Sequence, residues 1–119
     1  MDIEDLEIYR EAMRIGDQVW DHVTEWTFFE KDTVGKQWVR CTDSIAANIS
    51  EGYGRFHYLE NKKFCYYSRS SLDETLTFLE KAATRNLIPE SNALQLKNDL
   101  TILRKRLNSY IRSIGPRDQ

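Results

Sequence analysis

The stretch from Ser44 to Arg55 combines side chains that form hydrogen bonds and ion pairs with an apolar spacing that is typical of a helix. Asn48, Glu51 and Arg55 stand within about two helical turns, so an amide, a carboxylate and a guanidinium share one part of the segment. Polar groups at half-buried positions lose hydration unless they find partners. The cluster therefore either fixes one helix to another or forms a surface that recognises a partner.

Ser71 and Glu74 are the expected partners of this cluster, because they lie one turn apart on a later apolar segment. Within the cluster itself, Glu51 and Arg55 have the i,i+4 spacing of a helical ion pair. A network that joins the two later side chains to the first three would satisfy all of them, and we interpret it as structural. The predicted structural network comprises Asn48, Glu51, Arg55, Ser71 and Glu74.

Basic and aromatic side chains are interleaved around the end of this motif and along the segment that follows. Aromatic rings stack on bases and cations hold phosphates, so the mixture suits a nucleic-acid contact. Tyr, Trp and Arg are also enriched in subunit interfaces, and we favour the interface. The candidate nucleic-acid contacts are Arg55, Lys62, Lys63 and Arg69, with Arg104 and Lys105 in the last segment.

The sequence offers no recognised catalytic, cofactor or metal motif. Its two histidines, His22 and His57, lie in different segments, and neither belongs to the Glu-x-x-His pair of di-iron bundles. No serine stands on a Gly-x-Ser-x-Gly turn, and no glycine-rich phosphate loop is present. We therefore expect no catalytic residue, no cofactor and no metal, and a protein that is not an enzyme.

Composition predicts one helical domain over residues 1–119, with a mass of 14.1 kDa. Two prolines and five glycines are few, which favours long helices.

Cys41 and Cys65 lack a C-x-x-C partner and are expected to be buried, reduced thiols of a cytoplasmic protein. No apolar run approaches the ~20 residues that span a bilayer. The opening residues are acidic where a secretory leader is basic, so we expect a soluble protein without membrane contact.

The net charge of −2 conceals an uneven distribution along the chain. Residues 1–31 carry nine acidic and three basic side chains, whereas residues 90–119 carry six basic and three acidic ones. The two ends of the sequence are expected to attract each other, within one bundle or between subunits. A pI of about 5.7 gives no general attraction for polyanions, so a nucleic-acid contact needs a local basic patch.

Apolar steps of three and four residues predict four helices, and their short connections predict an all-α, antiparallel up-down-up-down four-helix bundle. The second helix is expected to begin with Asp32 or Thr33 as its N-cap, and Gly16 to mark a close approach between helices. The expected helices cover about residues 4–26, 33–53, 58–86 and 90–114. The core seam expected for the first is Leu6, Tyr9, Met13, Gly16, Trp20 and Val23.

Three stretches of the chain carry a family resemblance. They are Asp5–Tyr9 with Ala12, then Gln37 and Arg40 followed by Ser44-Ile45-x-x-Asn48-Ile49-x-Glu51-Gly52-x-Gly54-Arg55, then Arg69-x-Ser71-Leu72-x-Glu74. In this order they resemble the 23S rRNA intervening-sequence protein family, also called four-helix-bundle proteins, over nearly the whole chain. The resemblance implies a left-handed up-down four-helix bundle that assembles into a homopentameric ring.

Members of that family are encoded within insertions of bacterial large-subunit rRNA genes or stand alone in genomes. A related branch, the accessory variability determinant of diversity-generating retroelements, is a basic pentamer that binds nucleic acid and the reverse transcriptase. This chain is acidic, and it has Ser70 where the family often has Gly. We therefore expect a non-enzymatic, homo-oligomeric assembly or adaptor module in a bacterial cytoplasm. The alternative is an accessory protein that binds RNA or DNA through a local basic and aromatic patch.

Overall fold

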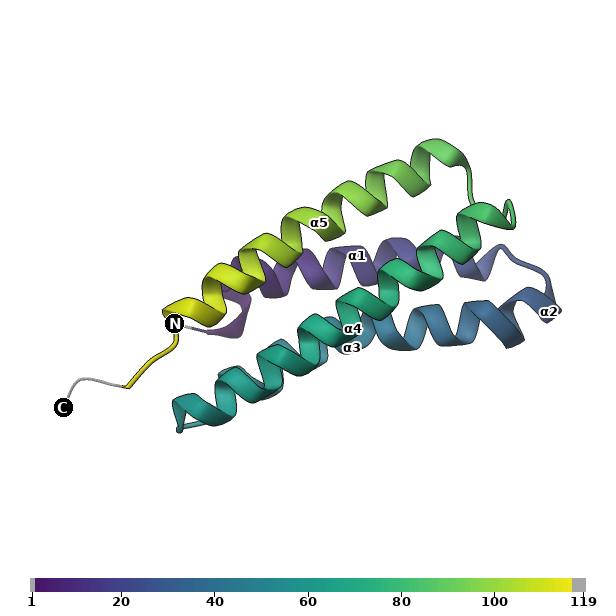
Figure 1. Ribbon diagram of the computed structural model, residues 1–119. Helices are drawn as coiled ribbons and strands as arrows, with labels where there is room; N and C mark the ends of the chain where they lie inside the picture. The colour runs from purple at the N-terminus through teal and green to yellow at the C-terminus, as the bar shows by residue number, and fades with distance from the viewer. Residues whose placement is uncertain (1, 117–119) are drawn as a thin grey trace.

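The computed structural model describes residues 2–116, and in this range the chain forms helices and no strand. Helices α2, η2 and α3 follow one another without a break, so four long helical segments make up the molecule (Figure 1). The elements in chain order are the 3-10 helix η1 (Ile3–Asp5), α1 (Glu7–Thr24), α2 (Phe28–Glu30), the π-helix η2 (Lys31–Gly35), α3 (Lys36–Tyr53), α4 (Tyr58–Thr84) and α5 (Glu90–Ser113).

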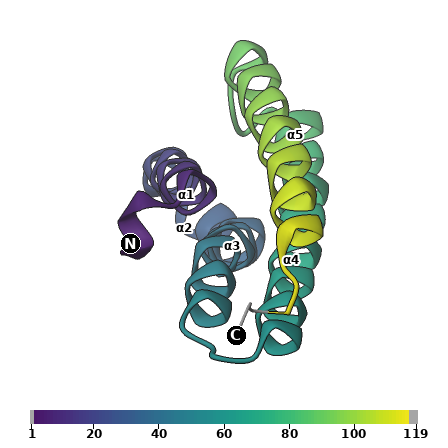
Figure 2. The same cartoon turned by 90° about the vertical axis from the view of Figure 1, so that its left-hand side faces the viewer.

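Neighbouring long helices run in opposite directions and form an elongated bundle of 54 × 23 × 21 Å (Figure 1). Helix α3 packs against α1 and α4, and α5 packs against α4 and α1. A view along the bundle shows α1 and α3 on one side and α4 and α5 on the other (Figure 2). The predicted all-α antiparallel bundle is confirmed, and the left-handed twist that the resemblance implies stays a prediction.

The core stripe of α1 is rotated relative to the predicted seam. Of that seam, Met13 is 46% exposed and Trp20 is 57% exposed. Aliphatic side chains of α1 face the interior of the bundle, whereas its Met13 and Trp20 lie on the outer surface. The buried residues of α1 are Ile8, Ala12, Ile15, Gly16, Val19 and Val23.

The second long segment begins earlier than predicted, and the expectation of Asp32 or Thr33 as its N-cap is wrong. Thr27 caps the segment: its hydroxyl accepts a hydrogen bond from the Glu30 N–H at 3.3 Å, and the Glu30 carboxylate accepts one from the Thr27 N–H at 3.0 Å. This reciprocal capping box starts the helix within the stretch that was expected to be a loop. The π-helical turn then brings Gly35 against α1, where a Cβ would meet Val23 Cγ1 at 2.8 Å.

The fourth helix follows the prediction most closely. Its predicted heptad leucines at positions 96, 100, 103 and 107 are all buried. The connection before it contains Asn86, which adopts a positive φ of 60° and allows the Leu87 N–H to donate to the Ala82 carbonyl at 2.8 Å. Left-handed backbone of this kind closes helix α4, which ends at Thr84.

Candidate functional site

Ser44 links the predicted polar network across the interface of α3 and α4. The Asn48 amide donates to the Ser44 carbonyl and to the Ser44 hydroxyl, both at 2.9 Å. From α4, the Ser71 hydroxyl donates to the Ser44 hydroxyl at 3.1 Å. The sequence placed Asn48 and Ser71 in one network but missed the serine that joins them. The feature of the sequence that could have identified Ser44 is its position four residues before Asn48, because a side chain on a helix can form a hydrogen bond with the residue four positions earlier.

Buried hydroxyl groups continue this polar seam along both helices. The Ser68 hydroxyl donates to the Ile45 carbonyl at 2.8 Å and thereby ties α4 directly to the backbone of α3. The Thr75 hydroxyl donates to the Ser71 carbonyl at 2.8 Å and contacts the Cys41 sulfur at 3.5 Å. Because these hydroxyls are satisfied inside the protein, the seam holds two helices together.

Glu51 and Arg55 form a separate pair on the surface. The Arg55 guanidinium donates to the Glu51 carboxylate at 2.5 Å, as the i,i+4 spacing predicted. Its carbon also lies 5.0 Å from the centroid of the Phe64 ring on α4. Within residues 2–116, no hydrogen bond joins this pair to Ser44 or Asn48. Exposed pairs of this kind add less than about 1 kcal/mol of stability.

Glu74 lies close to the seam without joining it. It lines a shallow polar groove between α3 and α4, together with Arg40, Ser44 and Ser71. Among the described residues, Glu74 forms no hydrogen bond or ion pair. The structure therefore unites Asn48 and Ser71, pairs Glu51 with Arg55, and leaves Glu74 beside them.

Both cysteines are free, buried and chemically quiet. Burial raises the pKa of the Cys65 thiol to about 11. Burial also raises the pKa of Cys41, and the charge of Glu74 adds to that rise. Both thiols are thus protonated at neutral pH, and only a thiolate is a good nucleophile. Neither cysteine is poised for covalent chemistry.

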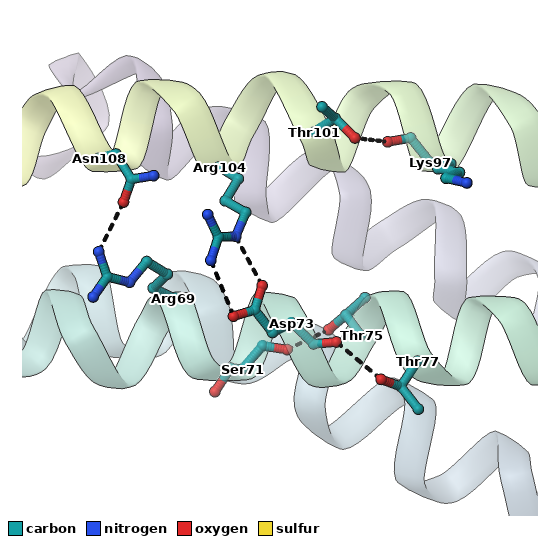
Figure 3. Close-up of polar contacts among 9 residues, drawn as sticks. All are labelled: Arg69, Ser71, Asp73, Thr75, Thr77, Lys97, Thr101, Arg104 and Asn108. Atoms are coloured by element: carbon teal, nitrogen blue, oxygen red, sulfur yellow. Dashed lines mark hydrogen bonds and ion pairs between the residues drawn. The ribbon is translucent and has the colours of Figure 1, made fainter.

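The basic and aromatic residues near the α3–α4 turn gather on one corner, which we call the basic corner: Arg55, Lys62, Lys63, Phe64, Tyr66, Tyr67 and Arg69. Lys63 Nζ lies 6.0 Å from the Phe64 centroid and 5.9 Å from the Tyr67 centroid. Arg69 lies 5.1 Å from the Tyr66 centroid and donates to the Asn108 side chain at 2.9 Å (Figure 3). The cations of the chain itself thus lie over these rings.

The two candidate contacts on α5 are held differently. Arg104 donates two hydrogen bonds to the Asp73 carboxylate on α4, at 2.8 and 3.3 Å (Figure 3). This bidentate contact raises the pKa of Arg104 above its usual value. Lys105, one residue later, is exposed and forms no ion pair within residues 2–116. Arg104 is therefore engaged with α4, whereas Lys105 is available to a partner.

The acidic start and the basic end of the chain attract each other within the bundle. Arg106 on α5 pairs with Glu7 at 3.1 Å and also with Glu11, and Arg14 on α1 lies 3.6 Å from Asp99. These ion pairs join α1 to α5. They leave part of the charge on both helices unpaired, including that of Asp17 and Lys105.

The described part of the chain holds neither a membrane span nor a metal site. No helix between residues 2 and 116 is long and apolar enough to cross a bilayer. In the same range, no group of three or more His, Cys, Asp or Glu side chains is placed to hold a metal ion.

The fold and the polar seam define an antiparallel four-helix-bundle protein. The family model for the 23S rRNA-intervening sequence protein matches residues 4–109, and the chain belongs to that family. A solved structure from Bacteroides thetaiotaomicron, described as a protein of unknown function from the S23 ribosomal protein family, superposes with a TM-score of 0.79. The two chains are 20% identical over 89% of this chain and 99% of the other. No curated protein matches this chain.

Proposed function

We propose that this protein is a non-enzymatic assembly or adaptor module that works as a homo-oligomeric ring in the cytoplasm. The observation that carries the proposal is the exposure of large apolar side chains on several faces of one small bundle. Phe28 and Phe29 are 81% and 74% exposed at one end of the bundle. Trp20, Leu59 and Leu94 on the long helices are each more than half exposed.

Exposed apolar surface of this extent favours association. Burying such side chains against a partner contributes about 25 cal/mol per Å² of apolar area. Trp20 lines a hollow between α1 and α3, whereas Leu94 lines one between α4 and α5, so the two side chains belong to different faces of the bundle. Repeated contacts between copies of the chain cover several faces at once. Five subunits is the number that the resemblance to the family implies.

The polar groups of the chain support a structural role. The Ser44 seam uses its hydrogen bonds to hold α3 to α4, and both thiols are protonated. Neither the family's description nor that of the solved structure names an enzymatic activity. Free buried cysteines are also typical of a reducing compartment, which supports the cytoplasm.

Light scattering coupled to size-exclusion chromatography tests the assembly. We expect a mass several times the 14.1 kDa of one chain, unchanged when the salt concentration is raised, because apolar contacts dominate. A single species at the mass of one chain, over a range of micromolar concentrations, would contradict the proposal.

Nucleic-acid binding is the second candidate, and the basic corner is the observation that favours it. Lys62, Lys63 and Arg69 form no ion pair with a carboxylate among residues 2–116, so their charges remain available. Binding of labelled RNA, followed by fluorescence anisotropy, should then fall steeply between about 50 and 200 mM salt. Lys62→Glu and Lys63→Glu should weaken it. No binding at the low-salt end would eliminate this candidate.

A further inference from the structure

We propose that the groove between α1 and α3 receives helix α5 of a second copy of the chain, in a head-to-tail contact. This inference rests on the proposed homo-oligomer and names the two surfaces that would form it. The groove, called here the α1–α3 groove, consists of two adjoining hollows on the outer side of the bundle. Asp43 lines both of them, so the groove is continuous along the two helices.

Small residues form the floor of the groove and large apolar residues stand at its edge. Ala12 and Ala46 are buried beneath it. Gly16 leaves room for the Asp43 carboxylate, which a Cβ at this position would meet at 2.8 Å. Met13 and Trp20, the two residues that were wrongly predicted to lie in the core, border the groove. The groove is therefore an apolar, concave surface with side chains of α1 exposed along one rim.

Charge divides the groove into an acidic half and a basic half. Asp17 lines the half toward the start of α1, and Asp43 lies where the two halves meet. Within residues 2–116 neither carboxylate has an ion-pair partner, and burial together with the Asp17 charge raises the pKa of Asp43. The other half is lined by Lys31, Lys36 and Arg40, of which Lys36 alone pairs, at 3.7 Å with Asp32.

The outer face of α5 carries a stripe of exposed apolar side chains at a spacing similar to that of the groove's rim. Leu94 and Ile102 are 63% and 38% exposed on it. They stand eight residues apart, or about 12 Å, and Met13 and Trp20 stand seven residues apart, or about 10 Å. A helix is convex and fills a groove, whereas two concave grooves cannot fill each other.

The order of charges sets the direction of the contact. The stripe begins at Glu90 and ends in basic residues, including the unpaired Lys105. It complements the groove when its basic end lies on Asp17 and Asp43, which places the docked α5 antiparallel to α1. Each bundle already holds its own α5 antiparallel to α1 (Figure 1). Adjacent bundles therefore point the same way, as the subunits of a cyclic ring do.

The groove and the stripe belong to different sides of one bundle, which makes the contact heterologous. α1 and α3 lie on one side of the molecule, and α5 lies on the other (Figure 2). A contact between two different surfaces leaves one of each free on every new subunit, so it propagates until the rotation closes a ring.

Two single variants and their mixture test the contact. Trp20→Lys disables the groove by replacing the large apolar side chain at its rim with a charged one, and Ile102→Glu disables the stripe by facing Asp17 and Asp43. Each variant alone should have the mass of one chain. The equimolar mixture should give a species of two chains, because one intact groove meets one intact stripe. The matched control, Ser70→Lys at an exposed polar position of α4, should keep the wild-type mass.

The outcomes separate this contact from the proposed oligomer. A wild-type protein with the mass of one chain overturns both. A wild-type oligomer that persists in both variants overturns only the α5 contact. Loss of assembly in Trp20→Lys but not in Ile102→Glu points to a groove-to-groove pair and also overturns it, as does a mixture that stays monomeric. Met13→Lys replaces Trp20→Lys if circular dichroism shows that the latter is unfolded.

Discussion

The Ser71 hydroxyl on α4 lies 3.1 Å from the Ser44 hydroxyl on α3 and donates a hydrogen bond to it. Ser44 also accepts from the Asn48 amide, so one small side chain satisfies two others. The motif that is most distinctive in the sequence therefore begins with a joint between two helices. Its last residue, Arg55, is not part of that joint and lies on the basic corner, over the Phe64 ring.

Ser44→Ala should lower the free energy of unfolding by about 1–2 kcal/mol, because it leaves the half-buried Ser71 hydroxyl without its acceptor and removes one of the two hydrogen bonds of the Asn48 amide. Urea denaturation followed by circular dichroism measures this loss. Ser50→Ala is the matched control, since Ser50 is exposed on the same helix, and its effect should stay within about 0.5 kcal/mol. Equal stability of the two variants would show that the Ser44 contacts add nothing.

Gly52 and Gly54 should respond differently to alanine although they stand two residues apart in the motif. A Cβ on Gly52 would meet the Asn61 carbonyl oxygen at 2.9 Å and Phe64 Cβ at 3.0 Å, whereas one on Gly54 would meet nothing closer than 3.8 Å. We expect Gly52→Ala to destabilise the protein by about 1–3 kcal/mol through overpacking. Gly54→Ala should be close to neutral. Thermal unfolding of both variants measures these effects. An unchanged unfolding temperature for Gly52→Ala would contradict the close approach of α3 and α4 at this position.

Asp43→Asn should stabilise the bundle at neutral pH. Because the pKa of Asp43 is raised in the folded state above its ordinary 3.8, folding favours the protonated form. The wild type therefore loses stability as the pH rises through the folded-state pKa, and the asparagine variant does not. The gain in the free energy of unfolding from Asp43→Asn should be present at pH 7 and shrink as the pH approaches 4.

The stabilities with and without Asp43→Asn are best compared in a chain that also carries Ile102→Glu, where assembly does not contribute to stability. In the chain that still assembles, Asp43→Asn should weaken association, because it removes a carboxylate from the α1–α3 groove. A stability difference that is independent of pH would contradict the assigned cause.

Both thiols should resist modification in the folded protein. The pKa of Cys65 is raised to about 11 and both side chains are buried, so little thiolate is exposed at pH 8. A chromogenic disulfide reagent should react slowly with the native chain and rapidly, at both cysteines, in concentrated guanidinium. Fast reaction of the native chain would show that the α3–α4 interface opens.

The sequence predicted the four helices well where only one apolar stripe exists. The α5 leucines offer a single way to face the core, and their burial was predicted correctly. Helix α1 has two overlapping stripes, one through Ile15 and Val19 and one through Met13 and Trp20. Both have helical spacing, and only the fit against α3 and α5 selects the first.

Part of the candidate site could be predicted from the apolar pattern of the helices that carry it. Asn48 and Ser71 lie on facing helices, and their apolar surroundings indicated a shared cluster. Glu51 lies on nearly the same side of α3 as Ser44, two turns further along, but it is exposed and pairs with Arg55 instead. The α1–α3 groove was not predicted, since it depends on the rotation of α1 and on the depth that Gly16 allows beside Asp43.

Disulfide trapping tests the head-to-tail assembly most directly. A chain carrying both Trp20→Cys and Leu94→Cys places one thiol in the α1–α3 groove and one on the α5 stripe, while Cys41 and Cys65 stay buried. On mild oxidation we expect a ladder of multimers on a non-reducing gel, with each single cysteine variant remaining at the mass of one chain. A double variant that also remains at the mass of one chain, or a single variant that forms dimers, would contradict the head-to-tail contact.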